Sequence, residues 1–178
     1  MDMGVISVRY ARALLKSATD AKQEDKVYSE MLTLSDSYVK VPELRLTIEN
    51  PMLPQETKEA LLVTAVGDNP TALTKSFIRL VLRNDRENVM QLMANSYITL
   101  YRRQKNIIRG KLTTAVPVSS ETENKMRAMV ESKAKGAVEF ETDVDPDIIG
   151  GFILEYDTFR MDASVKSKLN AILTALKK

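Results

Sequence analysis

The chain has 178 residues, and its 26 lysines and arginines nearly balance its 24 aspartates and glutamates. Because neither half carries a strong basic excess, the composition disfavours a nucleic-acid-binding protein. Cysteine and histidine are both absent, which excludes disulfides, thiolate nucleophiles, imidazole bases and conventional zinc sites. The first residues resemble neither a signal peptide nor an Arg-rich transit segment, and no apolar run approaches the ~20 residues that span a bilayer. We therefore expect a folded protein that acts where it is made and meets a membrane only through partners.

Residues up to Arg103 show helical periodicity with short breaks. Pro42, Pro54 and Pro70 each lie where the first turn of a helix accepts proline, and Asn84 and Asp85 are typical helix caps. The expected helices run from Val5 to Ala21, Glu24 to Val39, Pro42 to Ile48, Pro54 to Ala65, Pro70 to Arg83 and Val89 to Arg103. Helices joined by such short loops predict a six-helix bundle over residues 1–105.

The pattern changes after Arg103. Residues 107–117 are rich in β-branched side chains, and Ser120 with Glu123 forms a capping-box signature for a following helix. Residues 138–144 alternate between apolar or hydroxyl side chains and acids, as in a strand with one exposed face. The segments 148–156 and 159–161 predict a hairpin with its turn at Asp157 and Thr158.

A last helix follows, with Asp162 or Ser164 as its cap. Its apolar stripe consists of Val165, Leu169, Ile172, Leu173 and Leu176. Residues 106–178 should therefore form a small α+β domain. The expected fold class is mostly α, with an amino-terminal six-helix bundle followed by this small α+β carboxy-terminal domain.

Two short motifs resemble a calcium-binding loop and a phosphate-binding loop, but the residues around them do not fit either site. Asp143, Asp145 and Asp147 have the alternate spacing that opens a calcium loop, but Ile148 and Leu154 stand where that loop needs glycine and glutamate. A solvated strand face is the better interpretation. The Gly-Gly pair at 150–151 lies inside an apolar run, without the Lys-Ser or Lys-Thr of a phosphate-binding loop, and indicates a bulge or a close backbone approach.

One basic cluster spans the expected domain boundary. It consists of Arg102, Arg103, Lys105, Arg109 and Lys111. Cations at the end of a helix complement its dipole, so a charged helix end is the simpler interpretation. Contact with an acidic partner is the alternative, because five neighbouring cations can steer association.

The first and fifth expected helices have unusually wide apolar faces. At about 100° per residue, apolar or small residues cover about 220° of the first helix and about 200° of the fifth, roughly twice the stripe that a surface helix of a bundle needs. Either both helices are central and enclosed by their neighbours, or the apolar surface beyond the usual stripe is exposed. Such an exposed surface would form a groove for the amphipathic helix of a partner.

Several segments together resemble one known family. They are Tyr10-Ala11-Arg12-Ala13-Leu14, the step from Leu82 to Arg86, the run from Asp145 to Phe152 with its Ile-Ile-Gly-Gly-Phe, and Asp162-Ala163-Ser164. In this order the chain resembles the delta subunit family of F-type ATP synthases, which includes the oligomycin-sensitivity-conferring protein, from end to end. Two features depart from the family: Ala163 stands where glycine is frequent, and the turn around Asp157 is atypical.

The resemblance implies a non-catalytic stator connector without catalytic, cofactor-binding or metal-binding residues. Its bundle would bind the amino-terminal helix of an alpha subunit of the catalytic head, and its carboxy-terminal domain the b subunits of the peripheral stalk. It would work peripherally, at the cytoplasmic face of the bacterial inner membrane. Two alternatives stay open. They are an unrelated helical adaptor and an enzyme with paired carboxylates, although the acids here alternate along a strand instead of facing one another.

The resemblance and the helical geometry together predict a partner-binding face. In the first helix we expect Val8, Ala11, Leu14, Leu15 and Ala18 to face the core. The predicted partner-binding residues are Ile6, Tyr10, Ala13 and Ser17 on the first helix and Leu73, Phe77, Leu80 and Asn84 on the fifth.

Overall fold

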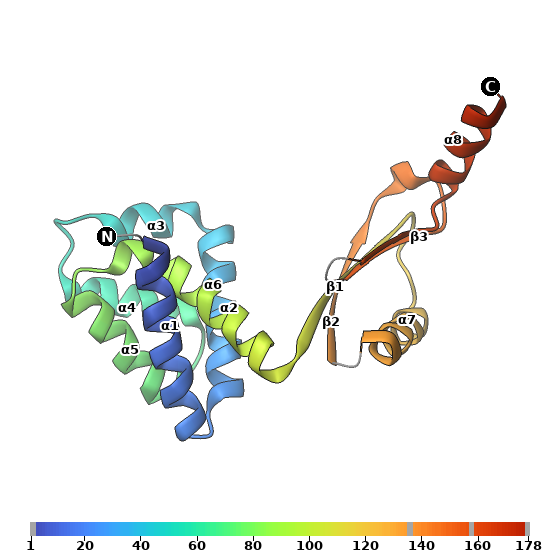
Figure 1. Cartoon of the computed structure of the whole chain (residues 1–178). Helices are drawn as coiled ribbons and strands as arrows, with labels where there is room; N and C mark the ends of the chain where they lie inside the picture. Colours follow the sequence, from blue (N-terminus) through green and yellow to red (C-terminus); the bar gives the residue numbers. More distant parts are fainter. Residues whose placement is uncertain (1–2, 135–136, 157–158, 177–178) are drawn as a thin grey trace. The chain divides into compact units, whose positions relative to one another are not determined.

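A computed structural model describes residues 3–134, 137–156 and 159–176. The chain divides into two compact units, Met1–Gln104 and Lys105–Lys178, which are described separately below. The described residues are mostly helical, with a small sheet confined to the second unit (Figure 1). The mostly α class with a small carboxy-terminal sheet agrees with the prediction from the sequence.

The described part of the first unit is made of helices. They are α1 (Met3–Asp20), α2 (Glu24–Lys40), α3 (Pro42–Glu49), α4 (Gln55–Val66), α5 (Ala72–Arg83), the 3-10 turn η1 (Glu87–Val89) and α6 (Met90–Lys105). Helix α2 contacts α1, α3, α4 and α5. Its apolar stripe, which includes Val27, Met31 and Leu34, is fully buried. This stripe is therefore the centre of the apolar core of the unit.

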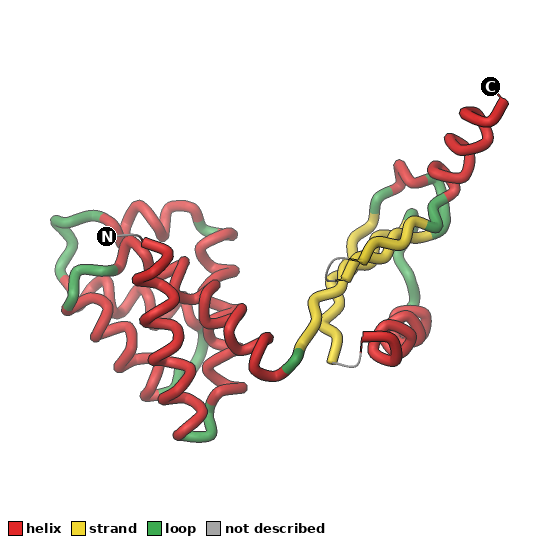
Figure 2. Tube along the Cα trace, viewed as in Figure 1, coloured by secondary structure: helices red, strands yellow, loops and turns green. Residues whose placement is uncertain are grey.

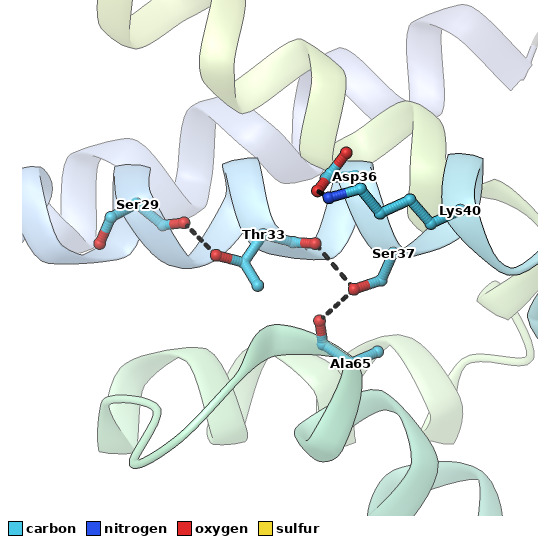
Figure 3. Close-up of polar contacts among 6 residues, drawn as sticks. All are labelled: Ser29, Thr33, Asp36, Ser37, Lys40 and Ala65. Atoms are coloured by element: carbon cyan, nitrogen blue, oxygen red, sulfur yellow. Dashed lines mark hydrogen bonds and ion pairs between the residues drawn. The ribbon is translucent and has the colours of Figure 1, made fainter.

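A hydroxyl group ties α2 to α4 (Figure 3). Ser37 Oγ lies 2.8 Å from the carbonyl oxygen of Ala65 and 2.9 Å from that of Thr33. Ala65 belongs to the last turn of α4, where carbonyl oxygens have no partner within the helix. Ser37 therefore satisfies a helix-end acceptor and fixes the end of α4 against α2.

The prolines mark helix starts less closely than expected. Pro42 is the first residue of α3, as predicted, whereas Pro54 precedes α4. The prediction that Pro70 opens the fifth helix is wrong, because Thr71 is the N-cap and α5 begins at Ala72. The prediction of a cap is confirmed for Asn84, which is the C-cap of α5. Asp85 is not itself a cap, and it has the positive φ of 49° that often follows a helix end.

The second unit contains a four-stranded sheet of order β2-β1-β3-β4, drawn in yellow in Figure 2. Its described elements are β1 (Ile107–Thr114), α7 (Ser120–Ala134), β2 (Ala137–Val144), the 3-10 turn η2 (Pro146–Ile148), β3 (Phe152–Tyr156), β4 (Phe159–Asp162) and α8 (Val165–Leu176). Strands β1 and β2 are parallel and joined through α7, and the other pairs are antiparallel. A parallel pair needs such a crossover connection.

The two faces of the sheet differ in polarity. Leu112, Val138 and Leu154 form a buried cluster with Val130 of α7, so α7 covers this face. The other face carries charged pairs between neighbouring strands: Lys111 with Asp143 at 3.0 Å, Arg160 with Glu155 at 3.3 Å, and Arg109 with Glu141. The acidic side of β2 is therefore a solvated strand face, as the sequence indicated.

The Gly-Gly segment corrects the predicted hairpin. The expected first strand from residue 148 is wrong, because Ile148 belongs to η2 and β3 begins at Phe152. Gly151 has φ of +76°, and a Cβ there would lie 2.3 Å from the carbonyl oxygen of Ala163. The close approach inferred from the glycines is thus present, between this segment and the turn that precedes α8. The predicted turn at Asp157 and Thr158 lies outside the described residues.

The caps of the last two helices are serines. The capping box predicted at Ser120 is wrong by one residue, since Ser119 Oγ accepts from the N–H of Thr122 at 3.4 Å. Ser164 caps α8, with its Oγ accepting from the N–H of Ser167 at 3.2 Å. Asp162 accepts from the N–H of Ser164 at 2.9 Å. Hydrogen bonds from Ser164 and then Ser167 lower the pKa of Asp162 to about 2, so this support for the cap is ionised at neutral pH.

Limited proteolysis should separate the two units. Asn106, with φ of 53°, lies between α6 and β1, and the neighbouring Arg103 and Lys105 are exposed. We expect trypsin to cut first between residues 102 and 111 and to leave a stable helical fragment that ends near Arg103. Mass spectrometry of a digestion time course checks this. Uniform degradation to small peptides, or resistance of the intact chain, would contradict it.

Replacing Gly151 with alanine should destabilise the second unit. The positive φ and the clash with Ala163 lead us to expect a loss of about 2 kcal/mol or more in the free energy of unfolding, measured in urea. Gly150→Ala is the matched control, because its Cβ would meet only the side chain of Val165, at 3.1 Å. Equal effects of the two substitutions would show that the close approach does not constrain the fold.

Candidate functional site

A groove lies between α1 and α5, two helices in direct contact. Its volume is about 520 Å³. The lining residues are Arg9, Tyr10, Ala13, Leu14 and Ser17 of α1, and Leu73, Ser76, Phe77, Leu80 and Asn84 of α5 and its C-cap. Arg9 is the charged residue of this described lining. The groove is therefore an apolar trough with one cation at its rim.

A buried carboxylate fixes the start of α5. Glu30 of α2 is 6% exposed and accepts from the backbone N–H of Thr71 at 2.7 Å and from the Thr71 hydroxyl at 2.9 Å. The Thr74 hydroxyl donates to the same carboxylate. A buried carboxylate is costly unless several donors satisfy it, and here three donors from the first turn of α5 do so. Glu30 thereby locks one wall of the groove to the centre of the bundle.

Contacts between the walls fix the other end of the groove. The Asn84 side-chain amide donates to the Tyr10 hydroxyl at 3.1 Å. The rings of Tyr10 and Phe77 meet edge to face, with centroids 6.5 Å apart and planes at 68°. Such a pair is favourable beyond its buried area. The spacing of the two helices is thus set by side chains that also line the groove.

Most of the predicted partner-binding residues lie together. Tyr10, Ala13 and Ser17 line one wall, and Leu73, Phe77, Leu80 and Asn84 line the other. Ile6 is the exception, because it is 6% exposed and is absent from the lining. The sequence did not single out Arg9, Leu14 or Ser76 as groove residues. Leu14 was expected in the core, and it is in fact buried while also lining the groove.

The two wide helices are not enclosed by their neighbours. Leu80 is 48% exposed, Ala13 and Ser17 are exposed, and Leu73 is half-buried. Val8, which we expected in the core, is 37% exposed. Of the two interpretations of the wide apolar faces, the one in which part of the apolar surface is exposed is therefore correct. A trough with an aromatic and aliphatic lining suits the apolar face of a helix.

The carboxy-terminal helix has a second uncovered apolar face. No residue of α8 is buried among those described. The exposed fractions along its predicted stripe rise from 37% at Val165 to 54% at Leu173 and 79% at Leu176. An apolar stripe at helical spacing that its own unit does not cover is typical of a protein interface.

The charged clusters have local explanations. Arg102 donates to the Tyr28 hydroxyl at 2.9 Å and lies over that ring, 5.8 Å from its centroid. Arg109 and Lys111 pair with acids of β2. The hydrogen bond between Lys111 and Asp143 raises the pKa of the lysine and lowers that of the aspartate. In the basic cluster these three cations are thus engaged within the chain, which favours a structural role for them.

The described residues contain no cluster of possible metal ligands. No three acidic side chains among them lie close enough to hold a metal ion. Asp143 pairs with Lys111, and Asp145 instead accepts from the N–H of Asp147 at 3.0 Å. None of the described helices is long and apolar enough to cross a bilayer.

Comparison with known proteins gives a consistent result. The family model described as ATP synthase delta (OSCP) subunit matches residues 6–176. A relative in Phocaeicola vulgatus, ATP synthase subunit delta, is 48% identical over 173 residues, covering 97% of this chain and 94% of the relative. The protein of that name in Bacteroides thetaiotaomicron is 41% identical over 174 residues, with the same coverage.

The fold also matches a solved structure. A chain of the Toxoplasma gondii mitochondrial ATP synthase hexamer superposes with a TM-score of 0.67. The match covers 97% of both chains at 21% sequence identity. The arrangement of helices and sheet is therefore shared with that chain.

Removing the charge of Glu30 should loosen the bundle. Glu30→Gln keeps the shape of the side chain but replaces an acceptor oxygen with a donor that faces other donors. We expect it to lower the free energy of unfolding by about 1–3 kcal/mol in a urea titration. Glu56→Gln, at an exposed position in the first turn of α4, is the matched control. If both variants unfold at the same urea concentration, the carboxylate does not hold α5.

Proposed function

The chain belongs to the ATP synthase delta (OSCP) subunit family, and we propose that it is the stator connector between the catalytic head and the peripheral stalk. As a delta subunit it is a structural subunit of an enzyme that couples proton transport to ATP synthesis, and not itself an enzyme. Membership in the family rules out the unrelated helical adaptor and the carboxylate enzyme. The groove between α1 and α5 is the observation on which the proposal rests.

We propose that the groove binds the amino-terminal helix of an alpha subunit. The trough runs along α5, whose 12 residues correspond to about 18 Å, or three helical turns. A guest helix of that length presents apolar side chains at intervals of three and four residues. Leu80, which is 48% exposed, offers aliphatic contact to them, and the largely buried ring of Phe77, 7% exposed, lines the trough. The small Ala13 and Ser17 permit a close approach of the guest backbone.

We propose that the stripe on α8 binds the b subunits of the peripheral stalk. The observation that supports this is the exposure of Leu169, Ile172 and Leu173, each close to half of the side chain. Such a face is costly in water and becomes favourable when a partner covers it. Residues 1–105 would then hold the head, and residues 106–178 would hold the stalk.

The proposed mechanism is mechanical. A rotary enzyme must hold its catalytic head still against the torque of the turning stalk, and a connector resists torque through interfaces that do not slip. Interfaces of this kind draw most of their free energy from a few buried anchors, and no bond is made or broken in this chain. The protein would work peripherally, on the cytoplasmic face of the bacterial inner membrane.

Charge introduced on the two walls should separate binding from folding. In Ala13→Asp and Leu80→Asp the new carboxylate lies on the exposed side of the helices, so the bundle stays folded. A carboxylate buried under a guest helix should weaken binding of an alpha amino-terminal peptide by at least about 2 kcal/mol. Isothermal titration with the peptide measures this loss.

Leu14→Asp is the contrasting variant. Leu14 is 4% exposed, so a carboxylate there enters the core and should unfold the bundle, as seen by circular dichroism. The partner face is misassigned if Ala13→Asp unfolds the protein, or if both groove variants bind the peptide as tightly as the unmodified chain.

A further inference from the structure

A second, shallow surface lies along the flank of α1 that adjoins the α1–α5 groove, and all of its lining residues belong to α1. Its volume is about 850 Å³, and its lining includes Val5, Val8, Arg12 and Lys16. Val5 is 54% exposed and Val8 37%, and both cations are exposed. Arg9 and Ala13 line this surface and the α1–α5 groove alike. Helix α1 is therefore a ridge between two adjoining surfaces, and its outer flank has no role in the function proposed above.

The charge on this flank is predominantly positive. At about 100° per residue, Val5, Val8, Arg9, Arg12 and Lys16 fall within about 100° of arc on the helix. The one acid in the described part of α1, Asp20, lies one turn after Lys16 and about 20° outside this arc. Arg9, Arg12 and Lys16 form no ion pair with any acid among the described residues, whereas cations such as Arg79 and Arg127 do. The flank thus combines exposed apolar side chains with three positive charges that form no ion pair with a described acid.

We infer that the outer flank of α1 is a second docking surface, which takes an acidic amphipathic helix of a protein partner. A helix lying along α1 repeats at the same pitch, so acids spaced by three and four residues would meet Arg9, Arg12 and Lys16 on successive turns. Apolar residues next to those acids would cover Val5 and Val8. At many helix–helix interfaces, charged residues beside an apolar contact determine which partner binds.

Other polyanions fit the surface less well. The whole chain has a net charge of +2, far from the excess that gives nucleic acids or anionic membranes most of their affinity. A membrane-surface helix also inserts a broad apolar face. Here the broad apolar side of α1, with Ala11, Leu14 and Leu15, is buried in the bundle.

A designed probe tests the inference in the full-length chain. The probe is a labelled amphipathic peptide of about 18 residues, or five turns, with leucine on one face and glutamate on the other, titrated at low salt by fluorescence anisotropy. We expect the unmodified chain to bind this peptide and the double variant Arg12→Glu/Lys16→Glu to bind it about tenfold more weakly or worse. A version of the peptide with lysine in place of glutamate should not bind. Lys166→Glu/Lys168→Glu, with the same change in net charge on exposed positions of α8, should bind the probe normally.

The outcome is separable from that for the α1–α5 groove. Leu80→Asp changes the groove alone, so it should leave binding of the acidic probe unchanged while binding of the alpha peptide falls. The inference is overturned if the probe does not bind, if Leu80→Asp abolishes its binding, or if both charge-reversed variants lose it equally. The last experiment uses vesicles of phosphatidylserine and phosphatidylcholine. If the chain binds these vesicles through Arg12 and Lys16 but does not bind the probe, the flank binds a membrane and the inference is overturned.

Discussion

A single buried carboxylate joins the centre of the amino-terminal unit to the wall of its groove. Glu30 comes from the helix that contacts most of the others, and its oxygens accept from Thr71 and Thr74, 41 and 44 residues further along the chain. Because both threonines belong to the start of α5, the network fixes where that helix begins. The contact of Phe77 with Tyr10 then sets its spacing from α1. In the proposed function the groove holds a partner helix, and walls of fixed separation lower the cost of ordering the groove when that helix binds.

Much of the groove could be predicted from the sequence, because the angle of a side chain around a helix depends on its position alone. That geometry correctly grouped Ala13 with Ser17 and Phe77 with Leu80. It failed for Ile6 and Val8, in the first turns of α1, where burial depends on which neighbouring elements cover the helix. The start of α5 was missed for a related reason, since its anchor is a glutamate distant in sequence.

In the carboxy-terminal unit, too, the sequence predicted local features and missed those that depend on tertiary contacts. Alternation predicted β2, and the glycine pair predicted a close backbone approach, because these are local signals. The partner in that approach, the carbonyl of Ala163, is a tertiary feature that the sequence does not reveal, and so β3 was expected to start too early. The stripe of α8 was visible as a pattern, but its exposure depends on what the fold leaves uncovered. The alpha and stalk partners came from family resemblance, and periodicity contributed only the surfaces.

In the proposed function this subunit joins two partners through two separate surfaces, and a pair of variants can distinguish these surfaces. Full-length protein carrying Leu80→Asp or Leu173→Asp would be mixed, in separate experiments, with purified catalytic heads lacking delta and with a soluble fragment of the peripheral stalk, and the bound chains quantified. We expect Leu80→Asp to lose binding to the head and keep binding to the stalk, and Leu173→Asp to lose binding to the stalk and keep binding to the head. Loss of both partners by either folded variant, or of neither partner by both, would contradict it.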